Sequence, residues 1–280
     1  RAHNQLYRSR RFDIRTWMDV LFTDVPRQIF RDRCVQTAFC LFWLVFMMSA
    51  YLAMNGEQWP NYAEKLMTPA VLEQMQDSFS QPIGGRPSGT NPIMASFYIQ
   101  HNTGIGLQCF AGGLLLIPGL MVTIFNAAHL GAAFGYMARP GIAEGNNFFE
   151  FVTAHGPFEL TAIVLSSGAG LRLGLAWIRT NGLTRSDSLR HHARESMPLM
   201  GAAMVMFFLA ALIEGFLSPS AAPYWIKAAV ALVSSGLLMF YFVILGFPQN
   251  SLGIFSRSER PEPISFDSIP DVPVQRTQGT

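Results

Sequence analysis

The sequence predicts an all-α protein that crosses a membrane with five or six helices, some of them broken or re-entrant. Half of the 280 residues are hydrophobic and only 14% are charged. The apolar residues are concentrated in long runs, and a run of about 20 residues is what an α-helix needs to cross the hydrocarbon layer of a bilayer. Water-soluble domains rarely contain several such runs, so the sequence predicts a polytopic membrane protein.

Residues 1–34 are predicted to form a basic amphipathic elbow ahead of the first membrane span, 35–54. Arginines outnumber acidic residues in the elbow. Its large apolar residues recur at mostly helical spacing: Phe12, Ile14, Trp17, Met18, Leu21, Phe22, Val25, Ile29 and Phe30. This pattern favours a helix on the membrane surface, broken or kinked at Pro26, over a helix packed on a cytosolic domain. The arginines also predict a cytosolic N-terminus, because positive charge is retained on that side.

The segment 55–101 is predicted to be an external loop. It is mildly acidic, and Pro69 follows Thr68 within it. Proline suits the first position of a helix, because the amide that it lacks would have no partner there. We therefore expect a short external helix from Pro69 to Phe79.

A membrane helical domain is predicted over 102–247, and it contains two runs that are too long for one ordinary span. The first, 103–138, is interrupted at Pro118 and Gly119. The sequence allows three interpretations of this run: one long kinked helix, a span with a half-helix, or two short spans. The second, 148–178, is interrupted by glycine and proline. Two clean spans complete the domain, 197–217 and 225–247.

The basic loop 179–196 is predicted to be cytosolic, and this constrains the topology. If 103–138 crosses the membrane once, then 148–178 must return as a re-entrant hairpin. If 103–138 crosses twice, then 148–178 crosses once. Both routes leave the polar, Pro- and Ser-rich tail 248–280 in the cytosol, where its composition predicts disorder.

Six polar side chains inside these runs define a candidate interior polar site: His155, Glu159, Arg172, Asn126, His129 and Glu214. Ionisable groups are costly in hydrocarbon and usually face protein or water. His155 and Glu159 share one helical face because they are four residues apart, which suits a proton or cation site. The favoured alternative is structural, with Glu159 anchored by Arg172 or by exposed backbone. In a straight helix, Arg172 would lie about 20 Å from Glu159. An ion pair between these two residues therefore requires the chain to fold back near 168–170. Without a fold-back, Arg172 marks the cytosolic end of the span.

Small residues in the same runs predict close helix packing, or the seam of a dimer. They are Gly112, Gly113, Gly131, Gly168, Gly170 and Gly174. The sequence contains no Walker motif, nucleophile elbow or HExxH motif, and its three cysteines form no CxxC pair. We therefore expect no enzymatic activity, no cofactor, no metal and no nucleic-acid partner.

The stretch His155-Gly-Pro-Phe-Glu-Leu-Thr-Ala-Ile163, followed by Gly168-Ala-Gly-Leu-Arg-Leu-Gly174, resembles the signature of the stage II sporulation protein M family of bacterial and archaeal membrane proteins. Other stretches that resemble the family are 94–102, 109–113, 125–132 and the arginines Arg8 to Arg11. One departure is Ala127-Ala128-His129, where the family pattern has an Asn-Gly pair and an apolar residue.

The resemblance implies a scaffold in the bacterial cytoplasmic (inner) membrane that recruits cell-envelope partners and has no catalysis of its own. The expected contacts are the loop 55–101 and the elbow, and the expected partners are membrane lipid, other membrane or envelope proteins and a second copy of the chain. The alternative is a transporter or channel whose interior polar site surrounds Glu159, because broken helices and polar groups at membrane depth are typical of transporters. An intramembrane enzyme would need a nucleophile–base pair that the sequence does not show.

Overall fold

The described part of the chain is built from helices. A computed structural model describes residues 18–84 and 87–248, and every regular element within them is helical. Five helices are long and apolar enough to cross a membrane. They are Arg33–Met54 (α4), Ile117–Met137 (α8), Gly156–Ala176 (α10), Arg185–Leu217 (α11 with the π-helical turn η3) and Tyr224–Ile244 (α12 with the π-helical turn η4). The prediction of an all-α protein with several membrane-spanning helices is confirmed.

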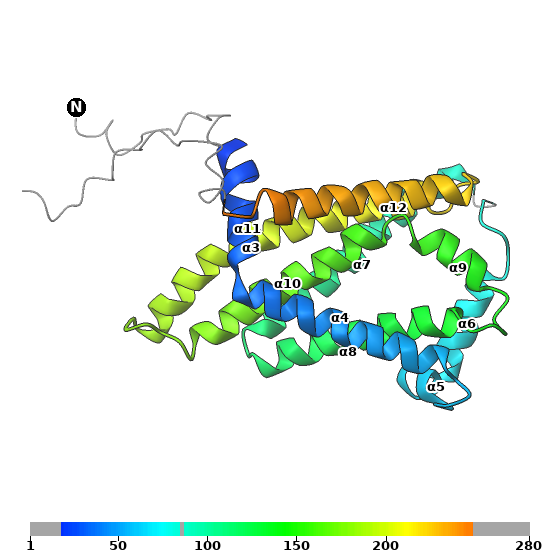
Figure 1. Ribbon diagram of the computed structural model, residues 1–280, viewed down its shortest axis with the longest axis horizontal. Helices are drawn as coiled ribbons and strands as arrows, with labels where there is room; N and C mark the ends of the chain where they lie inside the picture. Colours follow the sequence, from blue (N-terminus) through cyan, green and yellow to red (C-terminus); the bar gives the residue numbers. More distant parts are fainter. Residues whose placement is uncertain (1–17, 85–86, 249–280) are drawn as a thin grey trace, which may run out of the picture. The chain divides into compact units, whose positions relative to one another are not determined.

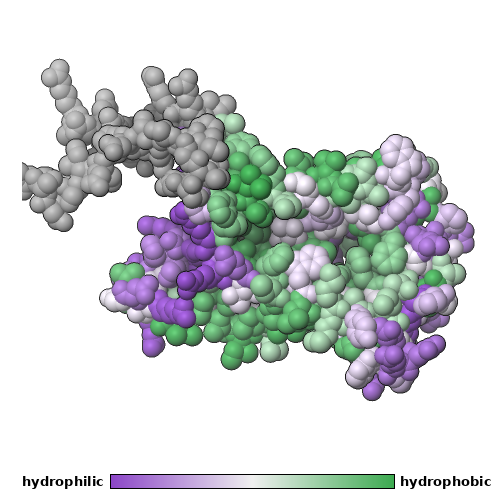
Figure 2. All heavy atoms as spheres, viewed as in Figure 1, coloured by the Kyte–Doolittle hydropathy of each residue, from purple (hydrophilic) through white to green (hydrophobic). Residues whose placement is uncertain are grey.

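The helix α10 lies at the centre of the bundle. It contacts α4, α8, α11 and α12 and also Asn91–Gly113 (α7), and its most apolar stretch is 61% buried, against 11% for α12. The core contains fully buried side chains from three helices, α4, α10 and α11: Phe42, Ile163, Leu165, Leu199 and Phe207. Figure 2 shows hydrophilic residues gathered towards the two ends of the face in view and hydrophobic residues in the band between them. An exposed apolar band of this kind is typical of a surface that faces lipid.

The overlong run 103–138 belongs to two antiparallel helices, α7 and α8 (Figure 1). The helix α7 begins at Asn91, within the segment 55–101 that was predicted to be an external loop. The two helices have 23 and 21 residues and are joined by a tight turn at 114–116. At ~1.5 Å per residue, each helix is long enough to cross the hydrocarbon layer.

The predicted break at Pro118 is not where the chain reverses. Pro118 lies in the first turn of α8, where its missing N–H leaves no hydrogen bond unmade. The reversal lies just before it, at Leu116, whose φ of 55° is unusual for a residue other than glycine.

The second overlong run, 148–178, does not form a re-entrant hairpin. It contains most of the short helix Gly145–Val152 (α9) and then α10, which continues unbroken through Gly168 and Gly170. The helices correspond to those of the second predicted route: the run 103–138 is divided between two helices, and 148–178 contains one long helix.

The elbow before α4 bends at a different residue from the one predicted. A π-helical turn, Val20–Asp24 (η1), leads into Val25–Arg31 (α3), and Pro26 lies in the first turn of α3 without interrupting it. The chain bends at Asp32, whose extended ψ of 109° separates α3 from α4 and whose side chain accepts hydrogen bonds from two amides of α4. The predicted residues Phe12, Ile14, Trp17 and Arg8 to Arg11 lie outside the described residues, as does 249–280.

Three short helices cover the end of the bundle where α4 ends and α10 begins (Figure 1). They are Tyr62–Met67 (α5), Pro69–Phe79 (α6) and α9, and together we call them the cap layer. The predicted helix from Pro69 to Phe79 is confirmed. The cap layer shares a second apolar core with α4 and α8, formed around Ala53, Met67, Leu72, Met137 and Phe148. Arg139 fastens it, because Nε donates to the carbonyl of Ala53 at 2.7 Å and Nη1 donates to Glu64 at 3.3 Å.

The small residues singled out in the sequence lie at helix–helix contacts within the chain. A methyl group on Gly113 would overlap the backbone of Gly170, and one on Gly131 would overlap the carbonyl oxygen of Phe46 in α4. Gly168 and Gly174 lie against the backbone of α4 and the end of α7 respectively. The remaining glycine, Gly112, would place a methyl carbon 3.4 Å from the backbone of Gly119, an ordinary contact.

We expect Gly131→Ala to lower the free energy of unfolding by about 1–3 kcal/mol, because the added methyl group forces α8 away from α4. The measurement is thermal unfolding in detergent. The matched control is Gly201→Ala on α11, where an added methyl group has no neighbour within 4 Å. Equal melting temperatures for the two variants would contradict this account of the α4–α8 contact.

Candidate functional site

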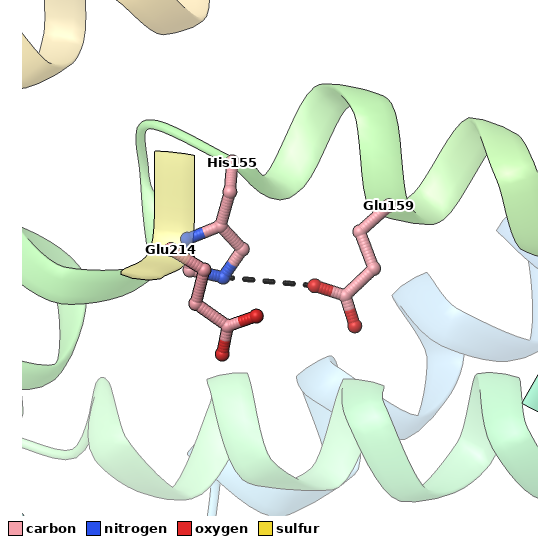
Figure 3. A group of neighbouring side chains, drawn as sticks. All are labelled: His155, Glu159 and Glu214. Atoms are coloured by element: carbon pink, nitrogen blue, oxygen red, sulfur yellow. Dashed lines mark ion pairs between the residues drawn. The ribbon is translucent and has the colours of Figure 1, made fainter. Parts of the chain in front are cut away.

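Three ionisable side chains meet where α10 begins and α11 ends. His155 immediately precedes α10, Glu159 lies in the first turn of α10, and Glu214 belongs to the π-helical turn Ile213–Leu217 (η3) at the end of α11. Figure 3 shows the three side chains pointing towards one another. One nitrogen or oxygen atom from each residue lies within 4.8 Å of the others. We call these three residues the polar trio.

Ser218 fixes the orientation of the His155 ring. The hydroxyl Oγ of Ser218 lies 3.0 Å from Nδ1 of His155, so the other ring nitrogen, Nε2, faces Glu159 Oε2 at 3.6 Å. Both His155 and Ser218 are buried, with 4% and 0% of their surface exposed. The histidine is therefore held by one defined hydrogen bond and presents its second nitrogen to the carboxylates.

The π-helical turn η3 carries Glu214 into the trio. A π-helix places one extra residue in the turn, which changes the direction of the side chains that follow, and such turns are frequent at functional sites. The turn is closed by the Ser218 amide, which donates to the carbonyl of Ile213 at 2.9 Å. Gly215 allows the turn to approach α7, because a methyl group there would overlap Ala95. One short segment therefore supplies both a carboxylate and the hydroxyl that orients His155.

A buried lysine lies next to the trio. Lys227, near the start of α12, has no exposed surface, and its Nζ donates to Glu150 Oε1 and to the carbonyl of Ser218, both at 2.9 Å. The pair connects α12 to α9 and to the turn after η3. The sequence analysis did not single out Lys227 or Glu150. The available signal was a lone lysine in an otherwise apolar run.

The other three predicted site residues do not join the trio. Arg172 pairs with Asp32 at 2.5 Å and with Glu195 at 2.6 Å, at the end of α10 opposite to Glu159. The pair between Arg172 and Glu159, one of the alternatives from the sequence, is therefore absent from the described residues, and the fold-back that it required does not occur. Asn126 donates within α8 to the carbonyl of Val122, and His129 stacks on Phe125 with ring centroids 5.5 Å apart.

The chemistry of the trio is that of a cation or proton site. Two carboxylates and an imidazole supply oxygen and nitrogen donors of the kind that hold Zn²⁺ and related ions. The sequence analysis placed these three residues in one candidate polar site, but it expected no metal ligands among them.

Long apolar helices, polar ends and ionisable groups buried inside the bundle define a multispan helical membrane protein. The family model described as Stage II sporulation protein M matches residues 38–219, which is more than half of the chain. The chain belongs to the stage II sporulation protein M family, and the resemblance found in the sequence is confirmed. No curated protein and no solved structure matches it. The matched residues include the polar trio and Ser218, whereas Lys227 lies beyond them.

Proposed function

We propose that this protein is a non-enzymatic scaffold that holds cell-envelope proteins at a bacterial cytoplasmic membrane. The observation that carries the proposal is the cap layer, an ordered group of helices fixed to one end of the bundle with one side exposed. A surface that is rigid before binding loses less conformational entropy when a partner docks. The family resemblance, which implies a scaffold, supports the same function.

The helix α6 is the part of the cap layer best placed to contact a partner. Its apolar side, with Leu72, Met75 and Phe79, packs inward against the second core. Its other side is exposed and, apart from Val71, polar or acidic: Glu73, Gln74, Asp77 and Ser78. The side chain of Asn147 in α9 donates to two carbonyls at the end of α6, those of Phe79 and Gln81, at 2.8 and 3.1 Å. These contacts hold the exposed side of α6 in a fixed position.

Charge supports an external position for the cap layer. The loop between α10 and α11 and the start of α11 are rich in arginine: Arg179, Arg185, Arg190 and Arg194. They lie at the end of the bundle away from the cap layer (Figure 1). Since positive charge favours the cytosolic side, this end is assigned to the cytosol and the cap layer to the external side.

The test is site-specific photo-cross-linking in native membranes, followed by mass spectrometry. A photo-reactive residue at Gln74, on the exposed side of α6, is expected to give cross-links to envelope proteins. The matched control is the same residue at Met75, which faces the second core and is expected to cross-link within the chain. The proposal would be contradicted if Gln74 gave cross-links only to a second copy of the chain, only to lipid, or none.

A second candidate function, ion transport, is favoured by one observation: the buried His155 meets two partly buried carboxylates, Glu159 and Glu214, within the bundle. A transporter should lose ion- or pH-dependent flux in proteoliposomes when Glu159→Gln removes a carboxylate of the trio, and should keep it in Glu73→Gln, a control on the exposed side of α6. Equal flux in both variants and in the wild type would dismiss transport through the trio. That result would leave the scaffold proposal unchanged.

A further inference from the structure

We propose that His155, Glu159 and Glu214 bind one divalent first-row transition-metal ion, which ties the start of α10 to the end of α11. The inference does not depend on the scaffold function. It rests on three features of the trio: the spacing of the donor atoms, the orientation of His155, and the charge of the site.

The spacing of the donor atoms suits a small metal ion better than a direct hydrogen bond. Metal–ligand distances of about 2.0–2.2 Å in tetrahedral geometry place neighbouring donor atoms about 3.4 Å apart. Nε2 of His155 and Oε2 of Glu159 are 3.6 Å apart, which is longer than an ordinary hydrogen bond. All three donor atoms lie within 4.8 Å of one another. A movement of about 1 Å at the carboxylates, within the range of side-chain rotation, completes the site.

The orientation of His155 is the one that a metal ligand needs. Metal-bound histidines usually donate their other ring N–H to a neighbouring oxygen, which fixes the tautomer and the ring plane. Ser218 Oγ is placed to accept that hydrogen bond from Nδ1, at 3.0 Å. The lone pair of Nε2 is then directed at the carboxylates. Ser218 is fully buried and belongs to the turn that carries Glu214, so the same segment provides a ligand and orients another.

The charge of the site also suits a cation. Glu159 and Glu214 are partly buried, and two carboxylates brought together away from bulk water are costly unless positive charge or protons compensate them. The buried lysine beside them, Lys227, bonds to Glu150 at 2.9 Å, so its positive charge is already balanced by a carboxylate outside the trio. A divalent ion would match the two negative charges of Glu159 and Glu214.

The ligand types indicate the class of metal. An imidazole nitrogen with two carboxylates suits Zn²⁺, Mn²⁺, Fe²⁺ or Co²⁺, whereas Mg²⁺ and Ca²⁺ prefer oxygen ligands alone. Three protein ligands leave at least one coordination position for water or for another molecule. The site is therefore expected to bind Zn²⁺ or Co²⁺ in preference to Mg²⁺.

The test uses the full chain, purified in detergent and treated with a chelator. Zn²⁺ binding is measured by calorimetry, and Co²⁺ is used as a spectroscopic probe of the ligands. We expect one equivalent of Zn²⁺ per chain and a Co²⁺ absorption spectrum of low coordination number. Glu159→Gln and Glu214→Gln should each weaken binding by more than about 100-fold, and Ser218→Ala by about 10- to 100-fold because it releases the His155 ring.

Two variants serve as controls and should bind Zn²⁺ like the wild type. Glu73→Gln removes an exposed carboxylate of α6, and His129→Gln removes a histidine of α8 outside the trio. If a trio variant does not elute as a folded protein, the wild type and Ser218→Ala still decide the result. The proposal is overturned if the folded wild type takes up no Zn²⁺, if folded trio variants bind it unchanged, or if the controls lose binding equally.

Discussion

We expect Arg172→Met to lower the free energy of unfolding by about 3–5 kcal/mol, because it leaves a buried carboxylate without its cation. The Asp32 side chain is 1% exposed and pairs with Nη2 of Arg172 at 2.5 Å. The same carboxylate accepts hydrogen bonds from the amides of Cys34 and Val35, at 2.7 and 3.3 Å, and so caps α4. Loss of Arg172 therefore affects the start of α4 as well as its contact with α10.

The measurement is unfolding of the purified protein in detergent, by heat or denaturant. Arg172 has a second partner, Glu195, whose side chain is 40% exposed. Solvent screens an ion pair with such an exposed partner, so Glu195→Gln should lower the free energy of unfolding by only about 0.5–1 kcal/mol. The double variant Asp32→Asn with Arg172→Met should be more stable than Arg172→Met alone, because it removes the buried charge. Equal losses for Arg172→Met and Glu195→Gln would show that the burial of Asp32 is not the cause.

The second large effect is expected at Lys227. We expect Lys227→Met to lower the free energy of unfolding by about 3 kcal/mol. The ammonium group has no exposed surface, and its removal leaves the carbonyl of Ser218 and the carboxylate of Glu150 without a donor. The Glu150 side chain is 29% exposed, so water compensates part of the loss, and the expected cost is at the lower end of the range for broken buried pairs. Among the five candidate spans α12 is the least buried, and this contact joins it to α9 and to the turn after η3.

The measurement is again unfolding in detergent, with Lys65→Met as the matched control. Lys65 is an exposed lysine of α5, and its substitution should change the free energy of unfolding by less than about 0.5 kcal/mol. The double variant Glu150→Gln with Lys227→Met should lose less than the sum of the two single losses, because both residues act in one pair. Strict additivity would indicate that Lys227 does not act through Glu150.

The sequence predicted those parts of the fold that depend on local pattern. Apolar runs located the long helices, and Thr68 with Pro69 located α6. The start of α7 was missed because Gln100, His101 and Asn102 make its first half polar, although it packs against α8 and α10. The turn after α7 was also missed, because it consists of leucines rather than the glycine or proline that usually mark a reversal.

The candidate site was predicted only where its residues are close in sequence. The spacing of His155 and Glu159 indicated a shared face, and the structure places them 3.6 Å apart. A pair between Arg172 and Glu159 was one of the alternatives, but the structure pairs Arg172 with Asp32, which lies 140 residues away in the sequence. Ser218 lacked any sequence signal, because the π-helical turn that positions it has no recognised pattern of residues. Contacts between distant segments depend on packing, which local periodicity does not determine.

The polarity of α7 has a consequence for how the chain enters a membrane. This helix contains no Asp, Glu, Lys or Arg, yet it is not among the helices apolar enough to be recognised as spans by composition. Insertion through a translocon depends on the summed free energy of transferring the residues of a segment from water into the membrane. For α7 alone, this transfer is only weakly favoured. The short turn at 114–116 couples it to the more apolar α8. The two helices should therefore partition into the bilayer together as a hairpin during biosynthesis, with α8 supplying the drive that α7 lacks.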